Sequence, residues 1–512
     1  MSKNVEPGLA ETKKSKDKPR SKQKGFSAED IMENTSNQEK ASFFDRKFGF
    51  TAKGSSLRTE IVAGITTFLA MAYILIVNAG MFNDLSNVSF DAIYVTTAIS
   101  AIVGTVLIGL LANLPLAQAP GMGLNAFFVY TVCFALGFSY ANALVFVLLD
   151  GIIFILLTVT GLRKIIFEAI PHAVKAAIPA GIGLFIAFLG LQDSGLVIPS
   201  ESTGVTLASF NLLSGSWEKV MPLIVAVISI LLIAVLSVKK VKGSILWGIL
   251  GGAALYYLLG LTVPGFYQNF GETMSLNPIE PFKAFGKEAF GKVFTEGFDF
   301  TAYLAVEGHS VGGLVIAFIT TSLAFCMVDM FDTMGTLYGA CRSGNLLVDN
   351  GKGELEVPNM ERAMLADAIA TCTGAVLGTS TVTTFVESSS GVAAGGRTGF
   401  SSLVTAGMFL VALFLAPVAK LIPAVAYGAA LVYVGILMIG CVKDIEWSDV
   451  SVAVPAFLTM AIMPFTYNIS YGIAFGLISY VVIKIFSGKV KEIKIGTWVI
   501  TLLFLAMFFL TH

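Results

Sequence analysis

The chain has 512 residues, of which 55% are hydrophobic and only 13% are charged, and its formal net charge is −1. Soluble proteins carry roughly 25% charged residues, so this composition excludes an ordinary soluble protein and indicates a polytopic membrane protein. The near-zero charge gives no support for nucleic-acid binding. Neither the five cysteines nor the three histidines have the spacing of metal ligands, so we expect no cofactor.

Residues 1–53 form the first segment. They are rich in lysine, carry both signs of charge and show almost no apolar periodicity before Phe43. Such a segment cannot bury enough apolar surface to fold by itself, so we expect a disordered tail. The basic excess ahead of the first span predicts that the tail is cytoplasmic.

Fourteen apolar segments follow, and two of them are too short for the roughly 20 residues that cross a bilayer. Lysines and arginines gather in alternate connections, including Arg163, Lys164 and Lys239, whereas 83–91 has none. This pattern satisfies the positive-inside rule for fourteen spans. The predicted spans are 61–82, 92–113, 121–136, 141–161, 173–191, 220–238, 244–263, 312–340, 361–378, 386–397, 399–419, 422–441, 449–465 and 468–486.

The order of these segments predicts an internal duplication. Ile65–Ala70 (ITTFLA) resembles Ile319–Ala324 (ITTSLA), and an Ile-Pro-Ala triplet occurs in the fifth and twelfth spans. Because seven is odd, the second repeat would be inverted, as in many transporters. The predicted organisation is a first repeat at 54–263, an ordered extracytoplasmic loop at 264–311, a second repeat at 312–488 and an apolar segment at 489–512, whose run 497–511 is either a fifteenth span or a helix on the membrane surface.

The two short spans are each third in their repeat, and we expect a strand followed by a half-helix in both. Thr381–Phe400 (TVTTFVESSSGVAAGGRTGF) has a β-branched run before the carboxylate Glu387, and small residues after it. In the other repeat, Pro120 and Gly121 precede Asn125, which we expect to cap the half-helix. Broken helices at membrane depth indicate a binding site, although Asn125 alone would also fit a purely structural cap.

Three polar residues of the eighth span, Asp329, Asp332 and Thr336, share one helix face because they are three and four residues apart. Intramembrane acids suggest function, although Asp329 could instead bond serine or threonine hydroxyls of a neighbouring span. Asp367 of the ninth span could join this network or pair with Arg362. Gly335 and Gly339 predict a close helix neighbour. The aromatic residues nearby could stack on a planar ligand or simply pack, and they are Phe127, Phe128, Phe331 and Phe385.

The motifs LNAFF, VDMFDTMGTLYG and TTFVESSSGVAAGGRTGFSSL resemble those of the AzgA-like purine permeases, a branch of the nucleobase–ascorbate transporter superfamily. The resemblance runs from about residue 42 to the end. It implies a core domain of spans 1–4 and 8–11, a gate domain of spans 5–7 and 12–14, an elevator-like motion, homodimers in the plasma membrane, and uptake of adenine, guanine and hypoxanthine with a proton. The segment after Glu387 lacks the Asn-x-Gly pattern of the xanthine, urate and uracil branches.

Carried onto this chain, the resemblance implies a substrate site made by Asp332, Glu387, Asn125 and, with them, Asp329. It also implicates the backbone N–H groups of Phe385, Val386 and Ala126, and places Thr336 where some relatives have a polar residue. Our hypothesis makes Glu387 the substrate acceptor and Asp332 the proton-coupled acid, although either acid could carry the proton and sodium is not excluded.

Two alternatives remain. A xanthine/uracil or anion carrier could share this fold. An intramembrane aspartyl hydrolase using Asp329 and Asp332 is disfavoured, because such a dyad needs acids on different helices that face each other.

Overall fold

The computed structural model describes residues 43–161, 169–213, 215–267, 277–306, 310–349 and 355–510. Most of the predicted tail, Arg163 and Lys164, and parts of the predicted loop 264–311 lie outside the described residues. Of two compact units, Met1–Lys47 contributes only the start of helix α2 (Phe43–Phe48), and Phe48–His512 holds all the other described elements.

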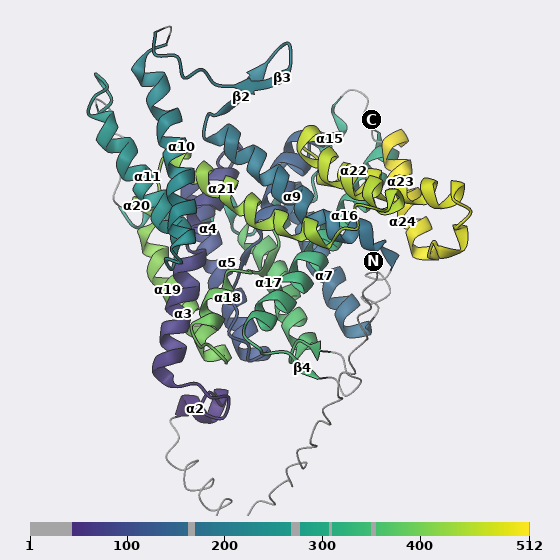
Figure 1. Cartoon of the computed structure of the whole chain (residues 1–512), viewed down its shortest axis with the longest axis horizontal. Coiled ribbons are helices and arrows are strands. Elements are labelled where there is room, and N and C mark those ends of the chain that lie inside the picture. The colour runs from purple at the N-terminus through teal and green to yellow at the C-terminus, as the bar shows by residue number, and fades with distance from the viewer. Residues whose placement is uncertain are drawn as a thin grey trace, which may run out of the picture. The chain divides into compact units, whose positions relative to one another are not determined.

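Helices occupy all seven predicted spans of the first repeat (Figure 1). Several begin at a serine whose hydroxyl group caps the helix, as Ser89 does by accepting a bond from Ala92 N. The helices are α3 (Leu57–Met71) with α4 (Ile74–Phe82), α5 (Phe90–Leu111), α6 (Met122–Ala126) continued by the π-helix η1 (Phe127–Ala135), α7 (Tyr140–Thr160), α9 (His172–Asp193), α10 (Trp217–Val238) and α11 (Ser244–Gly260).

The second repeat also has a helix in each predicted span. Nine helices or joined helices of the described chain are long and apolar enough to cross a membrane, and several shorter apolar helices accompany them. The prediction of a polytopic, largely helical protein is therefore confirmed. The helices are α16 (Val311–Ser343), α17 (Met360–Leu377), α18 (Ser388–Ala393), α19 (Gly399–Ala412) with η3 (Leu413–Leu415) and α20 (Ala416–Ala419), α21 (Ala424–Met438) with η4 (Ile439–Asp444), α22 (Val450–Thr466) and α23 (Ile469–Phe486).

The two broken spans meet through a pair of short antiparallel strands, β1 (Gln118–Pro120) and β6 (Val382–Thr384). Gln118 lies opposite Thr384, and Pro120 lies opposite Val382. Two further backbone hydrogen bonds of 3.0 Å, from Gly121 N to Thr381 O and from Phe385 N to Ala117 O, extend the ladder at both ends. Each strand thus satisfies the other's buried backbone groups, which is how extended chain survives at membrane depth. The predicted strand-plus-half-helix arrangement is confirmed.

The helices pack as two groups. One surrounds the strand pair and contains α3, α4, α5, α7, α16, α17, α18 and α19; the other contains α9, α10, α11, α21, α22 and α23. Within the second group, α9 and α21 cross backbone to backbone, since a Cβ on Gly435 would lie 2.3 Å from Gly183 O. We call the first group the core and the second group the gate below.

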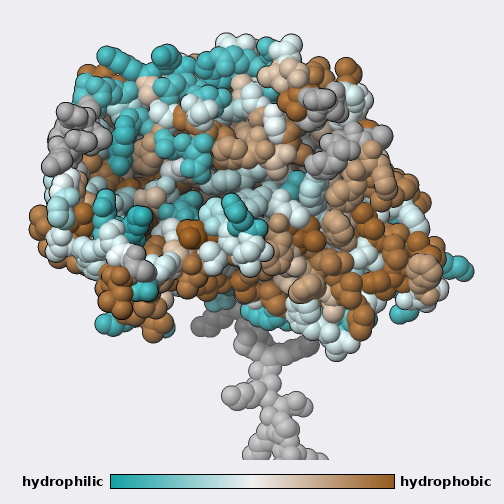
Figure 2. Space-filling model, turned by 90° about the horizontal axis from the view of Figure 1, so that it is seen from above, coloured by the Kyte–Doolittle hydropathy of each residue, from teal (hydrophilic) through white to brown (hydrophobic). Residues whose placement is uncertain are grey.

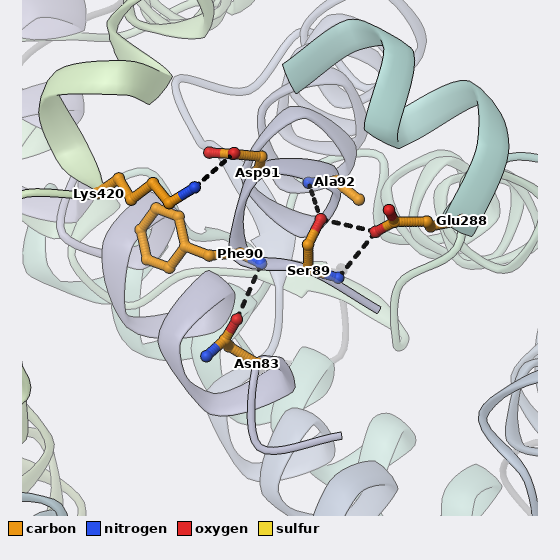
Figure 3. Close-up of polar contacts among 7 residues, drawn as sticks. All are labelled: Asn83, Ser89, Phe90, Asp91, Ala92, Glu288 and Lys420. Atoms are coloured by element: carbon orange, nitrogen blue, oxygen red, sulfur yellow. Dashed lines mark hydrogen bonds and ion pairs between the residues drawn. The ribbon is translucent and has the colours of Figure 1, made fainter. Parts of the chain in front are cut away.

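Residues 277–306 fold into short helices, as predicted for an ordered loop: α13 (Glu280–Ala284), η2 (Phe285–Ala289), α14 (Lys292–Thr295) and α15 (Thr301–Leu304). Figure 3 shows how this segment is held. Glu288 accepts hydrogen bonds from Ser89 N at 2.9 Å and Ser89 Oγ at 2.6 Å. Beside it, Lys420 forms an ion pair of 2.9 Å with Asp91. The start of α5 is therefore fastened both to this segment and to the end of α20.

Three elements lie outside the fourteen-span plan. The hairpin β2 (Val197–Ser200) and β3 (Gly204–Leu207) and the pair β4 (Val348–Asp349) and β5 (Leu355–Glu356) are largely exposed and were not predicted. The terminal apolar run forms α24 (Ile495–Leu510), which packs on α16 and α23. At about 1.5 Å per residue it is roughly 24 Å long, short of a bilayer core of about 30 Å.

Hydrophobic side chains cover much of the outer surface. In the view of Figure 2 they gather toward the lower and right margins, while hydrophilic residues gather over the upper left and the centre. Exposed leucines and phenylalanines, among them Leu231, Leu258 and Phe457, lie on membrane-length or shorter apolar helices. An apolar perimeter of this kind is the surface that a bilayer covers.

Candidate functional site

A cavity of about 310 Å³ lies between the core and the gate. Its volume is at the lower end of the range of roughly 300–1,000 Å³ found for small-molecule sites. Residues from both broken spans, from α16 and from two gate helices line it: Tyr73, Gly121, Met122, Gly123, Pro179, Phe331, Asp332, Gly335, Thr336, Thr383, Thr384, Phe385, Val386, Glu387, Val434, Leu437, Met438 and Cys441.

Glu387 lies in this cavity, where the extended chain after β6 turns into α18. Its Oε1 accepts a hydrogen bond of 2.6 Å from the Tyr73 hydroxyl group. Tyr73 is buried at the junction of α3 and α4, where the first span is interrupted. The sequence did not single out Tyr73, although a tyrosine at an interruption in an apolar span is a usable signal.

Asp332 enters the same cavity from α16. Its Oδ2 accepts a hydrogen bond of 3.2 Å from Thr383 Oγ1 on β6. One turn further along α16, Thr336 also lines the cavity, but its hydroxyl donates to the backbone carbonyl of Asp332 at 2.8 Å. The cavity therefore contains two carboxyl groups, each oriented by a hydroxyl group of the core.

Apolar side chains complete the walls. Phe331 and Phe385 come from the core, whereas Pro179, Val434 and Leu437 come from the gate. The backbone N–H of Phe385 is already used by Ala117 O at 3.0 Å, so this residue offers only its ring to a ligand. Val386 is 46% exposed. The arrangement suits a flat ligand with polar edges.

Asn125 does not occupy the position expected of it. The cap of α6 is Gly121, and Asn125 lies inside the helix, fully buried and outside the cavity. Its Oδ1 accepts a hydrogen bond from Ser380 Oγ, and its Nδ2 donates to Pro120 O at 3.3 Å. Asn125 therefore joins the two broken spans, and Ala126, which is also fully buried, does not line the cavity either.

The three eighth-span residues that were predicted to share one helix face do not all reach the cavity. Asp332 and Thr336 reach the cavity, whereas Asp329 is completely buried. Neither oxygen of Asp329 has a hydrogen-bond partner among the described residues. The hydroxyl group of Thr333, one turn further along α16, lies near Asp329 but donates to Asp367 at 2.8 Å. The structure therefore does not show the expected bond to Asp329 from a hydroxyl group of a neighbouring span.

Asp367 belongs to the core network. Besides the bond from Thr333, it accepts a hydrogen bond from Gln118 Nε2 at 2.9 Å and another from Thr384 Oγ1 at 3.4 Å. This network joins α16, α17 and both strands. Of the two roles expected for Asp367, the structure therefore favours membership of the polar network over an ion pair with Arg362, which is exposed.

Two smaller expectations also change. Among the described residues, Gly335 and Gly339 have no neighbour within 4 Å of a Cβ built on either, so they make no close helix contact there, and Gly335 instead lines the cavity. Phe127 and Phe128 are fully buried and pack on Phe325 and Phe82, so their role is packing.

Comparison with known proteins decides the family. The sequence profile described as "Permease family" matches residues 58–475. This chain belongs to that permease family. The permease is therefore a multi-pass membrane transporter and not an enzyme, which removes the hydrolase alternative, and the resemblance seen in its motifs is confirmed.

Several curated relatives match this permease over nearly their whole length. It is 40% identical to a putative permease of Methanocaldococcus jannaschii, covering 91% of this chain and 98% of that one. It is 38% identical to the guanine/hypoxanthine permease PbuO of Bacillus subtilis, and the match covers 90% of this chain and 100% of PbuO. It is 33% identical to the adenine permease AdeP of Escherichia coli, and the match covers 90% of this chain and 95% of AdeP.

Among solved structures, the permease is similar to the transmembrane domain of the cyanobacterial bicarbonate transporter BicA. The TM-score is 0.53 at 15% sequence identity, and the match covers 83% of this chain and 97% of the other. At this identity the likeness shows a common transporter fold and carries no information on the substrate.

Proposed function

We propose that this permease carries purine nucleobases into the cell together with protons. Relatives named as guanine/hypoxanthine and adenine permeases, aligned over about nine-tenths of the chain, support nucleobase transport. The observation that carries the finer proposal is the cavity that sets Glu387 and Asp332 beside Phe331 and Phe385. Purines have ring N–H groups on a flat aromatic body, and these features match a carboxylate acceptor and aromatic walls.

In this proposal Glu387 accepts hydrogen bonds from the purine ring. A carboxylate has two acceptor oxygens, and Tyr73 bonds to Oε1, so Oε2 is left for the substrate. The backbone N–H of Val386, the residue directly before Glu387, supplies a hydrogen-bond donor to the substrate. Phe385 contributes its ring, and Asn125, Ala126 and Asp329 act by holding the surrounding backbone and helices instead of touching the substrate.

Asp332 is the proton-coupled acid in this proposal. Two carboxylates in one small cavity repel each other, so a proton on Asp332 lowers the electrostatic cost of an ionised Glu387. Coupling requires that the loaded and empty states differ in affinity for the proton. An inside-negative membrane potential would drive uptake by about 2.3 kcal/mol per charge per 100 mV. Sodium is the competing coupling ion, and replacing sodium by potassium in the uptake medium separates the two.

The side chains of the site that carry hydroxyl or carboxyl groups all come from the core. Tyr73, Asp332 and Glu387 belong to it, whereas the gate adds the apolar residues Pro179, Val434 and Leu437. A smooth apolar wall breaks no hydrogen bond when a neighbour slides past it. We therefore propose that the core, with its substrate, moves against the gate in an elevator-like cycle.

The proposal also includes the domain organisation, the topology and the oligomeric state that the sequence predicts. Repeats at 54–263 and 312–488 form the transporter, 264–311 is extracytoplasmic, and residues 1–53 are a cytoplasmic tail. The protein would act as a homodimer in the plasma membrane, and cross-linking in native membranes tests this state.

Uptake in cells that lack their own purine carriers tests the function. Radiolabelled adenine, guanine and hypoxanthine should enter, and a protonophore should abolish accumulation. Unlabelled uracil, xanthine and bicarbonate should compete poorly, and strong competition by any of them would favour the alternative carriers. An anion carrier is disfavoured because the residues that line the cavity in the described structure include two acids and no lysine, arginine or histidine.

A further inference from the structure

Two carboxyl groups lie inside the core, away from the transport cavity. Asp150 on α7 and Asp329 on α16 are both completely shielded from solvent. None of their four carboxyl oxygens has a hydrogen-bond partner among the described residues. Neither residue lines the cavity. A buried polar group without a partner is rare in a folded protein and calls for an explanation.

The packing of three helices brings these acids together. Helix α7 packs against both α16 and α17, and Asp150 and Asp329 lie close enough to interact electrostatically with each other and with Asp367. The contact between α7 and α17 is tight, since a Cβ on Gly151 would lie 2.5 Å from Cys372 Sγ.

The other titratable groups near the pair do not balance its charge. They are Asp367 and Cys372 on α17 and Asp332 and Cys326 on α16. Asp367 already has three hydrogen-bond donors, from Gln118, Thr333 and Thr384. The ion pairs found in the described chain join other residues, namely Lys292–Glu296, Lys420–Asp91 and Lys484–Glu492.

Two ionised and unpaired carboxylates at this depth would be strongly unfavourable. A bound metal ion would need several ligands, and the described residues contain no group of three or more acids, cysteines or histidines placed to hold one. A proton needs only the pair, because a protonated carboxyl group donates one hydrogen bond and a carboxylate accepts it.

We propose that Asp150 and Asp329 form a proton-binding site within the membrane, separate from the transport cavity, in which the two carboxyl groups share one proton at neutral pH. The shared proton satisfies both side chains and fastens α7 to α16. This inference does not depend on which substrate is carried. It also gives α16 two distinct acids one turn apart, Asp329 toward α7 and Asp332 toward the cavity.

Infrared spectroscopy of the full-length protein in lipid nanodiscs tests the site. Protein labelled with ¹³C-aspartate should show a label-sensitive C=O band of protonated aspartic acid at neutral pH. That band should vanish or shift in both Asp150→Asn and Asp329→Asn. It should persist in Asp332→Asn, whose carboxyl group is in the cavity, and in Glu201→Gln, an exposed control.

Several outcomes would overturn the proposal. One is the absence of any label-sensitive protonated band in the wild type at neutral pH. A second is a band that survives in both asparagine variants and disappears only in Asp332→Asn. A third is a band that is lost when sodium replaces potassium, which would indicate a metal cation between two carboxylates. If the asparagine variants do not fold, the double variant Asp150→Glu, Asp329→Glu keeps both acids but removes both aspartate labels, so the band must lose its ¹³C sensitivity.

Discussion

The hydroxyl group of Tyr73 donates a hydrogen bond of 2.6 Å to Oε1 of Glu387, across 314 residues of sequence. The distance is typical of a charge-assisted O–H···O⁻ bond. It joins the interruption of the first span to the strand break of the tenth, and so fixes the direction of the carboxylate that we assign to the substrate.

Tyr73→Phe should weaken substrate binding while leaving the ring in place. Loss of a hydrogen bond to a charged group costs roughly 1.5–3 kcal/mol, so the apparent affinity for hypoxanthine should fall about ten-fold or more. Concentration-dependent uptake measures this change.

Tyr94→Phe is the matched control for that substitution. Its hydroxyl group donates to Ala412 O at 2.9 Å, also in the buried core, but Tyr94 does not line the cavity. An equal loss of affinity in both variants would show that the Tyr73 bond is structural.

A methyl group at Gly335 should narrow the cavity without disturbing the packing. Gly335 lines the cavity, and a Cβ there meets no atom within 4 Å. Gly335→Ala should therefore fold at least as well as the wild type, since alanine favours a helix by about 0.5–1 kcal/mol, yet transport purines several-fold less well. Gly339→Ala has the same open surroundings but lies outside the cavity, so its uptake should match the wild type. Normal uptake by Gly335→Ala would argue that the substrate lies elsewhere.

Two threonines on α16 should differ in how much their hydroxyl groups contribute to stability. Thr333 donates to the buried carboxylate of Asp367, whereas Thr336 donates to backbone carbonyls of its own helix. Thr333→Val should lower the free energy of unfolding by about 1–3 kcal/mol, because it removes one donor from a buried carboxyl group. Thr336→Val should change it much less. Thermal unfolding of both variants in the same detergent measures the difference, and equal melting temperatures would contradict the proposed network.

The spans and both strand breaks could be predicted because hydrocarbon imposes strong rules on sequence. Long apolar runs must be helical, and a β-branched run followed by serines and glycines cannot continue a membrane helix. Glu387 and Asp332 could be identified because isolated acids are conspicuous there. The same local signals left open whether Asp367 joined this network or paired with Arg362, and they could not reveal its partner Gln118, which lies far away in the sequence.

Residues whose role depends on distant contacts escaped prediction. Asn125 was expected at a helix start and instead bonds Ser380, because the crossing of the two broken spans, and not the local turn, sets its partners. In the sequence Tyr73 does not stand out from the other aromatic residues, because only the fold places Glu387 beside it. Asp150 sits in a run of aliphatic residues, and only the packing of α7 on α16 and α17 brings it near Asp329. A helical period tells which residues share a face, but not which neighbour that face meets.

The most direct measurement follows purine and proton together in liposomes that contain the purified protein. Radiolabelled hypoxanthine uptake and internal pH, read by a trapped dye, are recorded after a proton gradient is imposed. The wild type should accumulate hypoxanthine and acidify the lumen in step with it, and Glu387→Gln should lose both. Full accumulation by Glu387→Gln, or wild-type accumulation without any proton entry, would contradict the account.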